Sequence, residues 1–251
     1  MIMLYFSGTG NSKYIAELFS REMNAGSYSI EEDVDFSELI SANDTIGFCY
    51  PIYASRVPRI LRSFVARHMD VLKGKKLIIF CTQMLFSGDG ARAFTSLFPC
   101  GHVDVVYAEH FLMPTNVNNL LILPLAGDKS VEKYIARAQR KVQAVCADIK
   151  AGKVKRRGFN LGSRLLGLPQ AAVLPLMERK FNSAVRVRKS CDGCGLCVKL
   201  CPMQNLVLED GRITHKRDCT ACYRCVNKCP RGAITVGFHG KVRGRYWGPE
   251  A

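Results

Sequence analysis

The feature that most constrains this chain of 251 residues is a cysteine pattern that occurs twice near its C-terminal end. Residues 191–202 and 219–230 share the skeleton C-x-x-C-x-x-C-x-x-x-C-P, and these two runs hold eight of the twelve cysteines. Such crowding indicates either the disulfide framework of a secreted domain or metal ligation in a reducing compartment. Because the other cysteines are scattered, we expect the chain to divide into two modules.

The N-terminal residues favour metal ligation. Residues 1–6 lead straight into a Ser-Gly-Thr-Gly turn, without the basic, long apolar and small-residue segments of a secretion signal. The most apolar stretch, 165–177, is short and is broken by Pro169 and Pro175, so we expect no membrane span. The sequence therefore predicts a cytoplasmic protein with reduced thiols.

The spacing within each run suits an iron–sulfur cluster. A cubane cluster needs four thiolates from different directions, and C-x-x-C-x-x-C supplies three of them from one turn of chain. Structural zinc is the alternative, because C-x-x-C pairs also bind zinc. Tetrahedral zinc uses paired ligands, whereas each run has three cysteines at successive spacings of three and ends in Cys-Pro. The residues favour two [4Fe–4S] clusters.

Residues 184–238 strongly resemble the bacterial-type ferredoxins with two [4Fe–4S] clusters, including short apolar strand segments at 206–208 and 233–236. In that family the fourth cysteine of each run ligates the cluster of the other run. The resemblance implies one cluster on Cys191, Cys194, Cys197 and Cys229, and the other on Cys219, Cys222, Cys225 and Cys201.

The two runs differ at the positions between their cysteines. Gly193 and Gly195 let backbone amides of the first run approach a cluster closely. The second run has Ala221 and Tyr223 at these positions, so we expect a bulkier loop and a different reduction potential.

The N-terminal part of the chain alternates apolar strands with helices. Residues 2–6 read as a buried strand, followed by a turn and a helix whose apolar residues repeat at steps of three and four. Further strands are expected at 45–50, 76–81 and 103–107, and further helices near 58–67, 90–97 and 131–149. This alternation predicts an α/β fold with a doubly wound parallel sheet, followed by a smaller α+β domain.

The turn Ser7-Gly8-Thr9-Gly10-Asn11-Ser12 lies between the first strand and the first helix, where backbone N–H groups and the helix dipole favour an anion. It lacks the third glycine of the dinucleotide pattern, because Lys13 stands there, and it lacks the Gly-Lys pair of a P-loop. Its hydroxyls, amide and glycines suit a phosphomonoester. An ordinary glycine-rich turn is the alternative.

Residues 1–150 resemble the flavodoxins in the order of their elements. The phosphate loop of that family is matched residue by residue by Ser7, Thr9, Gly10, Asn11 and Ser12. The resemblance implies FMN as cofactor, and Ser12 keeps the hydroxyl of the more usual threonine. The whole chain resembles the flavodoxin–ferredoxin fusion proteins of anaerobes.

The loops that follow the other strands should complete a flavin site, because ligands of open α/β sheets bind beyond the carboxyl ends of the strands. We expect Tyr53 to stack on the ring, with Thr82 and Gln83 near its polar edge. The candidates outside the phosphate loop are Pro51, Tyr53, Ala54, Thr82, Gln83, Met84, Ser87 and Gly88.

Several neighbouring residues have alternative interpretations. Tyr50 and Phe86 are equally compatible with the core, and segment 113–116 has only its position at a strand end to connect it with the flavin. Cys49 and Cys81 lie at strand ends near the site, but free cysteine is mostly buried, so we expect them in the core.

The chain is basic, with a formal net charge of +15. Two clusters and one FMN phosphate would lower this to about +9. Between residues 150 and 190, eleven Lys and Arg residues accompany one acid, Glu178. We expect a flavodoxin-like domain at 1–150, a basic connector at 151–183, a ferredoxin-like domain at 184–240 and a basic tail at 241–251.

The connector predicts an anionic partner. Nucleic acid and an anionic membrane are alternatives, but aromatic residues for base stacking are sparse in this segment. An acidic redox protein fits best, because complementary charge steers encounter without permanent binding.

The cofactors together predict the function. FMN exchanges electrons in pairs or singly, whereas each cluster exchanges one. We expect an intramolecular electron-transfer protein that converts between one- and two-electron steps. The alternative is an iron–sulfur flavoenzyme that reduces a small molecule at FMN.

Overall fold

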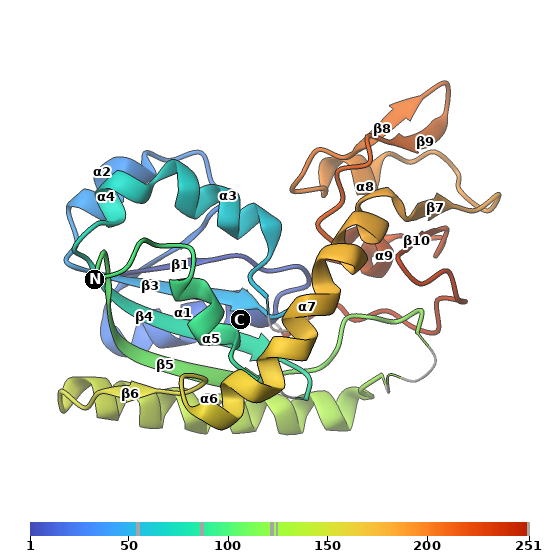
Figure 1. The fold of residues 1–251 in the computed structure, drawn as a ribbon. Helices are drawn as coiled ribbons and strands as arrows, with labels where there is room; N and C mark the ends of the chain where they lie inside the picture. Colours follow the sequence, from blue (N-terminus) through green and yellow to red (C-terminus); the bar gives the residue numbers. More distant parts are fainter. Residues whose placement is uncertain (54–55, 86–87, 121–122, 124, 250–251) are drawn as a thin grey trace.

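The computed structural model describes residues 1–53, 56–85, 88–120, 123 and 125–249, and it leaves the side chains of 170, 171, 173–177 and 179–182 undescribed. Figure 1 shows a larger α/β domain beside a smaller module, with one long helix running between them. The predicted division into two modules is therefore visible in the fold.

A six-stranded parallel sheet forms the centre of the larger domain, with strand order β2-β1-β3-β4-β5-β6. The strands are β1 (Ile2–Tyr5), β2 (Gly26–Ser29), β3 (Thr45–Pro51), β4 (Lys76–Gln83), β5 (Asp104–Leu112) and β6 (Lys155–Arg156). The order reverses between β1 and β3, as in a flavodoxin-like doubly wound sheet. The predicted fold class is confirmed.

Helices cover both faces of this sheet (Figure 1). One face carries α1 (Asn11–Met23) and α6 (Asp128–Lys150), and the other carries α2 (Phe36–Ser41), α3 (Arg59–Arg67), α4 (Met69–Leu72) and α5 (Gly90–Thr95). Phe80 on β4 packs edge-on against Phe19 of α1, whereas Phe48 on β3 packs against Phe94 of α5. The central strands are buried on both sides, which is why they read as continuous apolar runs.

Three strands differ from the sequence prediction. β2 was not anticipated, because its sequence GSYS is half-buried and lacks an apolar alternation. β6 has only two residues, both exposed at the sheet edge. β5 extends to Leu112, five residues beyond the predicted end, and thereby brings the following loop to the same edge as the phosphate loop.

The smaller module contains two short antiparallel sheets, and it too has the predicted class. Its elements are β7 (Val185–Val187), α8 (Leu196–Lys199), β8 (Leu206–Glu209), β9 (Arg212–His215), α9 (Arg224–Lys228) and β10 (Ile234–Val236). β7 pairs with β10, and β8 pairs with β9 in a hairpin. The core of this module is small, and six of the eight clustered cysteines pack against it, whereas Cys222 lies in the core of the larger domain and Cys194 is exposed.

Helix α7 (Leu161–Ser183) occupies most of the predicted connector and runs through both Pro169 and Pro175. An interior proline normally costs a helix about 3 kcal/mol. Tertiary contacts hold the helix at two of its described residues, since Gly167 packs directly against Asp89 and Glu178 pairs with Arg62 of α3. The expectation that the prolines break this segment was wrong.

Among the residues that the structure describes, no helix is both long enough and apolar enough to cross a membrane.

Candidate functional site

A pocket of about 550 Å³, including the open space at its mouth, lies beyond the carboxyl ends of β1, β3, β4 and β5. Its lining residues are Ser7, Gly8, Thr9, Asn11, Ser12, Pro51, Ile52, Tyr53, Thr82, Gln83, Met84, Pro114, Thr115, Asn116 and Val117. Ligands of doubly wound sheets bind at this position, where the strand order reverses.

Most of the predicted flavin-site residues meet in this pocket. Nine of them line it: Ser7, Thr9, Asn11, Ser12, Pro51, Tyr53, Thr82, Gln83 and Met84. Gly10 lies in the loop itself, directly before α1, whereas Gly88 packs against the backbone of α7 at Gly167. Ala54 and Ser87 lie outside the described residues, as does Phe86.

Part of the lining carries no sequence motif, whereas other residues near the strand ends lie in the core. Residues 114–117 form one wall of the pocket. In the sequence, only their position after a strand indicated that they could reach it. Tyr50 belongs to the core, where its hydroxyl donates to the carbonyl oxygen of Gly90 at 3.2 Å. Cys49 and Cys81 are fully buried in the core, as expected.

The loop before α1 has the geometry of a phosphate site. Gly10 adopts a left-handed conformation with φ of +102°, and its N–H donates to Ser7 Oγ at 3.0 Å. No described side chain caps the helix, and its first turn contains no acid. The N–H groups at the start of α1 are therefore available to an anion. Ser12 Oγ lies 2.8 Å from Thr82 Oγ1, which ties the loop to β4.

Two polar atoms in the pocket are buried and have no hydrogen-bond partner among the described residues, namely Tyr53 Oη and Gln83 Oε1. A buried polar atom without a partner is costly, so such atoms are typical of a site that a polar ligand completes. A flavin ring carries donors and acceptors along one edge, and the phosphate of FMN suits the loop. The residues present therefore fit FMN.

Tyr53 also faces the small module. Burial, together with the nearby Cys222 and Cys219 thiols, raises the pKa of its hydroxyl well above the usual value. The tyrosine therefore lies between the flavin pocket and the second cysteine run.

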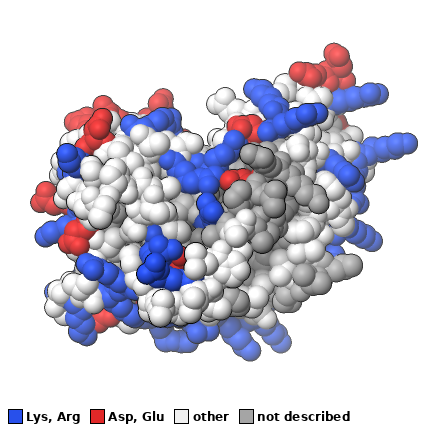
Figure 2. Space-filling model, viewed as in Figure 1, with Lys and Arg blue, Asp and Glu red and all other residues white. Residues whose placement is uncertain are grey.

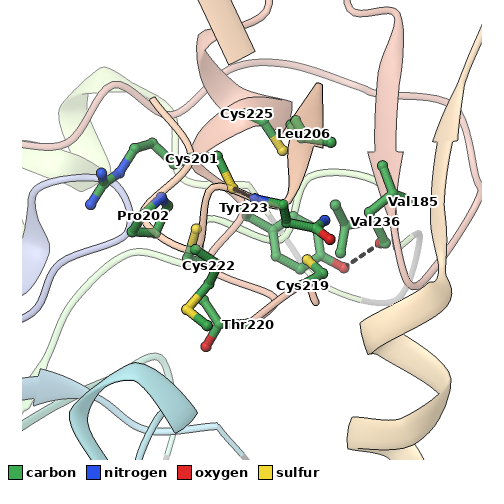
Figure 3. Close-up of a pocket in the computed structure, with 13 residues that line it drawn as sticks. Val185, Cys201, Pro202, Leu206, Cys219, Thr220, Cys222, Tyr223, Cys225 and Val236 are labelled. Atoms are coloured by element: carbon green, nitrogen blue, oxygen red, sulfur yellow. Dashed lines mark hydrogen bonds between the residues drawn. The ribbon is translucent and has the colours of Figure 1, made fainter. Parts of the chain in front are cut away.

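The eight clustered cysteines line two further pockets, four in each. One pocket is lined by Cys191, Cys194, Cys197 and Cys229. The other, shown in Figure 3, is lined by Cys201, Cys219, Cys222 and Cys225. Each pocket thus receives three cysteines from one run and the last cysteine of the other, which is the grouping that crossed ligation requires.

The chemistry of these pockets suits a cluster better than a single ion. Among the described residues, no three Cys, His, Asp or Glu side chains stand close enough together to hold one metal ion. Zinc would need thiolates at about 2.3 Å from a common point. Backbone N–H groups lie 3.3 Å from the sulfurs of Cys201, Cys219 and Cys229, where they compensate thiolate charge.

Burial makes these thiols hard to ionise without a cation. It raises the pKa of Cys219 to about 12 and that of Cys222 to about 11. Metal ligation requires the thiolate, so a bound metal must displace these protons.

Both runs have the same backbone conformation despite their different residues. Gly193 and Gly195 have φ of +70° and +71°, and Ala221 and Tyr223 have φ of +54° and +60°. A left-handed residue with a Cβ costs about 1–2 kcal/mol. Tyr223 offsets part of this cost, because its ring is buried and its hydroxyl donates to the carbonyl oxygen of Val236 at 2.9 Å.

The second cysteine pocket adjoins the phosphate loop. A Cβ at Gly8 would overlap the carbonyl oxygen of Cys222, so the two segments are in contact and only glycine fits. Asn116, in the wall of the flavin pocket, donates its Nδ2 hydrogen to the same carbonyl oxygen at 3.0 Å. One cysteine pocket and the flavin pocket therefore share a wall.

Buried amides and ion pairs hold the two modules together. Asn227 of α9 donates to the carbonyl oxygen of Asn116 at 2.8 Å and accepts from Asn118 at 3.2 Å. Arg59 of α3 pairs with Asp218 at 2.5 Å. Asn118 and Asn227 are fully buried, so these hydrogen bonds are costly to break and fix the modules relative to each other.

A ligand pocket at the switch point of a doubly wound sheet, beside two cysteine-lined pockets, defines an electron-transfer protein built from flavin and iron–sulfur modules. Residues 2–165 match the model of the flavodoxin domain, and residues 190–234 match the 4Fe-4S dicluster domain. The flavodoxin match covers more than half of the chain, which therefore belongs to the flavodoxin domain family as a flavodoxin–ferredoxin fusion.

Solved structures similar to the chain include flavodoxins. The flavodoxin of Megasphaera elsdenii is 20% identical, with 56% of this chain and 99% of that chain covered and a TM-score of 0.39. Flavodoxin 2 of Bacillus cereus is 18% identical, with 59% and 97% covered and a TM-score of 0.40. A comparison with curated proteins found no match.

Proposed function

We propose that this protein passes electrons between two [4Fe–4S] clusters and FMN within one chain. When bound, FMN accepts electrons in pairs or singly and each cluster exchanges one, so the chain would convert between the two regimes. Ser7, Thr9, Gly10, Asn11 and Ser12 would hold the FMN phosphate, and the two cysteine sets would each hold one cluster.

The contact between Gly8 and Cys222 is the observation that carries this proposal. Cys222 is a proposed cluster ligand, and its carbonyl oxygen touches the proposed phosphate loop. Tyr53 lines the flavin pocket. The nearby Cys222 and Cys219 thiols add to the effect of burial in raising the pKa of its hydroxyl. Electron transfer within one chain needs such proximity, and no flexible linker separates the two sites at this point.

The two cysteine sets differ in exposure, which supports an order for the relay. Cys194 of the first set is exposed, whereas Cys222 of the second set is buried against the flavodoxin domain. We assign the first set to exchange with an external partner and the second set to exchange with the flavin. In this scheme residues 1–150 carry the flavin and 184–240 the clusters, while 151–183 and 241–251 join them.

We further propose that the external partner is an acidic redox protein. Figure 2 shows Lys and Arg side chains along the outer edge of the small module. Exposed basic residues close in sequence to the first cysteine set are Arg186, Arg188, Lys189, Lys199 and Arg231. Complementary charge of this kind accelerates encounter. Rates with an acidic partner should fall as ionic strength rises, and rates independent of salt would contradict this assignment.

None of the twelve cysteines, each of which lies among the described residues, forms a disulfide. We propose a cytoplasmic location on this basis, because reduced thiols persist in that compartment.

The proposed function is tested by anaerobic purification, with iron, sulfide and flavin quantified per chain. We expect about eight irons and one FMN per chain. In a rapid-mixing experiment, a one-electron donor should reduce the clusters first and the flavin afterwards. About four irons, or no FMN, would contradict the proposal.

The Cys222→Ser variant sharpens this test. It should lose the cluster nearest the flavin and slow flavin reduction, while the first cluster remains. Cys100→Ser is the matched control, because Cys100 is exposed and belongs to neither cysteine set. Flavin reduction at the wild-type rate in Cys222→Ser would show that electrons reach the flavin by another route.

A further inference from the structure

The last described residues of the chain lie against the phosphate loop. Residues 243–249, here called the C-terminal strap, pass the loop where Gly248 meets the carbonyl oxygen of Thr9. A Cβ at Gly248 would overlap that oxygen, and Pro249 lies 3.7 Å from the Cβ position of Gly10. The strap therefore covers one side of the loop. It lies outside the flavodoxin-domain match, which ends at residue 165.

Tyr246 is the strap residue with the most direct effect on the loop. It is buried, and its hydroxyl donates to Asn11 Oδ1 at 2.5 Å. The other end of the same amide donates from Nδ2 to the carbonyl oxygen of Pro114 at 2.8 Å. Both ends of the Asn11 side chain are therefore held, one by the strap and one by the pocket wall.

This arrangement matters for an anion because an amide side chain carries an acceptor as well as a donor. If Asn11 Oδ1 turned toward a phosphate, its negative partial charge would oppose binding. The hydroxyl of Tyr246 holds that oxygen in a hydrogen bond, and Asn11 is the first residue of α1. The backbone N–H groups are thereby presented to the ligand without a competing acceptor.

The strap is anchored on the iron–sulfur module. The N–H group of Tyr246 donates to Asn227 Oδ1 at 2.8 Å, and Lys228 Nζ lies 4.3 Å from the centre of the Trp247 ring. Asn118 of the flavodoxin domain donates to the carbonyl oxygen of Gly244 at 2.7 Å. The position of Tyr246 therefore depends on helix α9, which contains Cys225 and lies between Cys222 and Cys229 of the second run.

We propose that the C-terminal strap is part of the flavin phosphate site, with Tyr246 as the positioning residue that orients Asn11. This inference rests on the proposed function, in which the pocket binds FMN. The flavin site is then composite, because its phosphate loop belongs to the flavodoxin domain and the strap that covers the loop is held by the iron–sulfur module. Flavin affinity thereby depends on the fold of the second module, and by linkage FMN stabilises the docked strap.

The test compares FMN with riboflavin, which lacks the phosphate, by titrating flavin-free protein that retains its clusters and following flavin fluorescence. Tyr246→Phe should raise the Kd for FMN about tenfold, because Asn11 Oδ1 loses its partner, and should leave the Kd for riboflavin unchanged. Gly248→Ala should produce the same FMN-specific loss by pushing the strap off Thr9. Iron content per chain verifies that each variant is folded.

Tyr107→Phe is the matched control, since Tyr107 donates a hydroxyl hydrogen bond to Asp148 at 3.0 Å, away from the pocket. It should bind FMN as the wild type does. An unchanged ratio of the two Kd values in both strap variants would overturn the inference, as would an equal loss in the control. A wild-type protein that binds no FMN would overturn the proposed function instead.

Discussion

Arg224 donates a hydrogen bond of 2.8 Å to the carbonyl oxygen of Ser7, and so joins the second cysteine run to the phosphate loop. The same guanidinium reaches the carbonyl oxygen of Gly8 at 3.2 Å and pairs with both carboxylate oxygens of Glu31. Arg224 lies between Cys222 and Cys225, so one side chain ties the proposed cluster loop to two parts of the flavodoxin domain. Guanidinium geometry suits this role, because it presents several donors in one plane.

We expect Arg224→Ala to lower the free energy of unfolding by about 2 kcal/mol, because carbonyl groups at the interface lose their donor and Glu31 loses its partner. The variant should also reduce its flavin more slowly, since the modules are held less firmly. Urea denaturation measures the first effect and rapid mixing the second. Arg212→Ala, at an exposed position on β9, serves as control. Equal stability of the two variants would contradict the role of Arg224.

Gly8→Ala should separate the phosphate loop from the second cysteine run, because the new methyl group would overlap the carbonyl oxygen of Cys222. We expect weaker FMN binding and slower transfer between cluster and flavin. Gly127→Ala is the control, since no atom lies within 4 Å of its Cβ position. Wild-type FMN affinity together with a wild-type transfer rate in Gly8→Ala would show that this contact is not required.

Ala221→Gly should stabilise the iron–sulfur module by about 1 kcal/mol, because glycine adopts the left-handed conformation of this position without a steric penalty. Thermal unfolding of the protein with its clusters bound measures the change. Ala151→Gly is the control and should lower the stability instead. Ala151 has φ of −81°, so glycine there only adds flexibility to the unfolded chain. A destabilised Ala221→Gly variant would mean that the methyl group packs favourably enough to outweigh the strain.

Acid should destabilise the flavodoxin domain through His110. Burial, assisted by the neighbouring Arg157, lowers the pKa of His110 to about 4. In the unfolded chain the histidine takes up a proton near pH 6.5, so stability is complete above that value and is lost as the pH falls toward 4. Between pH 7 and pH 5 the loss should be about 2 kcal/mol.

His110→Gln should remove this part of the pH dependence, which urea denaturation at several pH values measures. His102→Gln, in the loop before β5, should retain the dependence of the wild type. If the free energy of unfolding of His110→Gln still fell with pH as in the wild type, the effect would belong to other groups. Glu109, whose pKa is lowered, would then be the first candidate.

Local features of the sequence were sufficient to select the candidate residues of both proposed sites. The proposed phosphate loop consists of adjacent residues at the start of a helix, and each cysteine run is a local motif that supplies three cysteines to one pocket and one to the other. The doubly wound sheet was also predictable, because strands buried on both faces read as continuous apolar runs. β2 and β6 were not, since neither has an apolar pattern and both form by pairing with a neighbouring strand.

What only the tertiary structure decided is how these pieces meet. The contacts of Gly8 with Cys222 and of Asn11 with Tyr246 join residues more than two hundred positions apart, and no local pattern encodes such contacts. Helix α7 passes through two prolines, and Ala221 and Tyr223 adopt left-handed conformations, although local preference opposes both. In each case packing supplies more free energy than the backbone preference costs. The sequence by itself thus determined which residues are candidates to bind a phosphate or an iron–sulfur cluster, whereas packing between the modules placed the two proposed sites side by side.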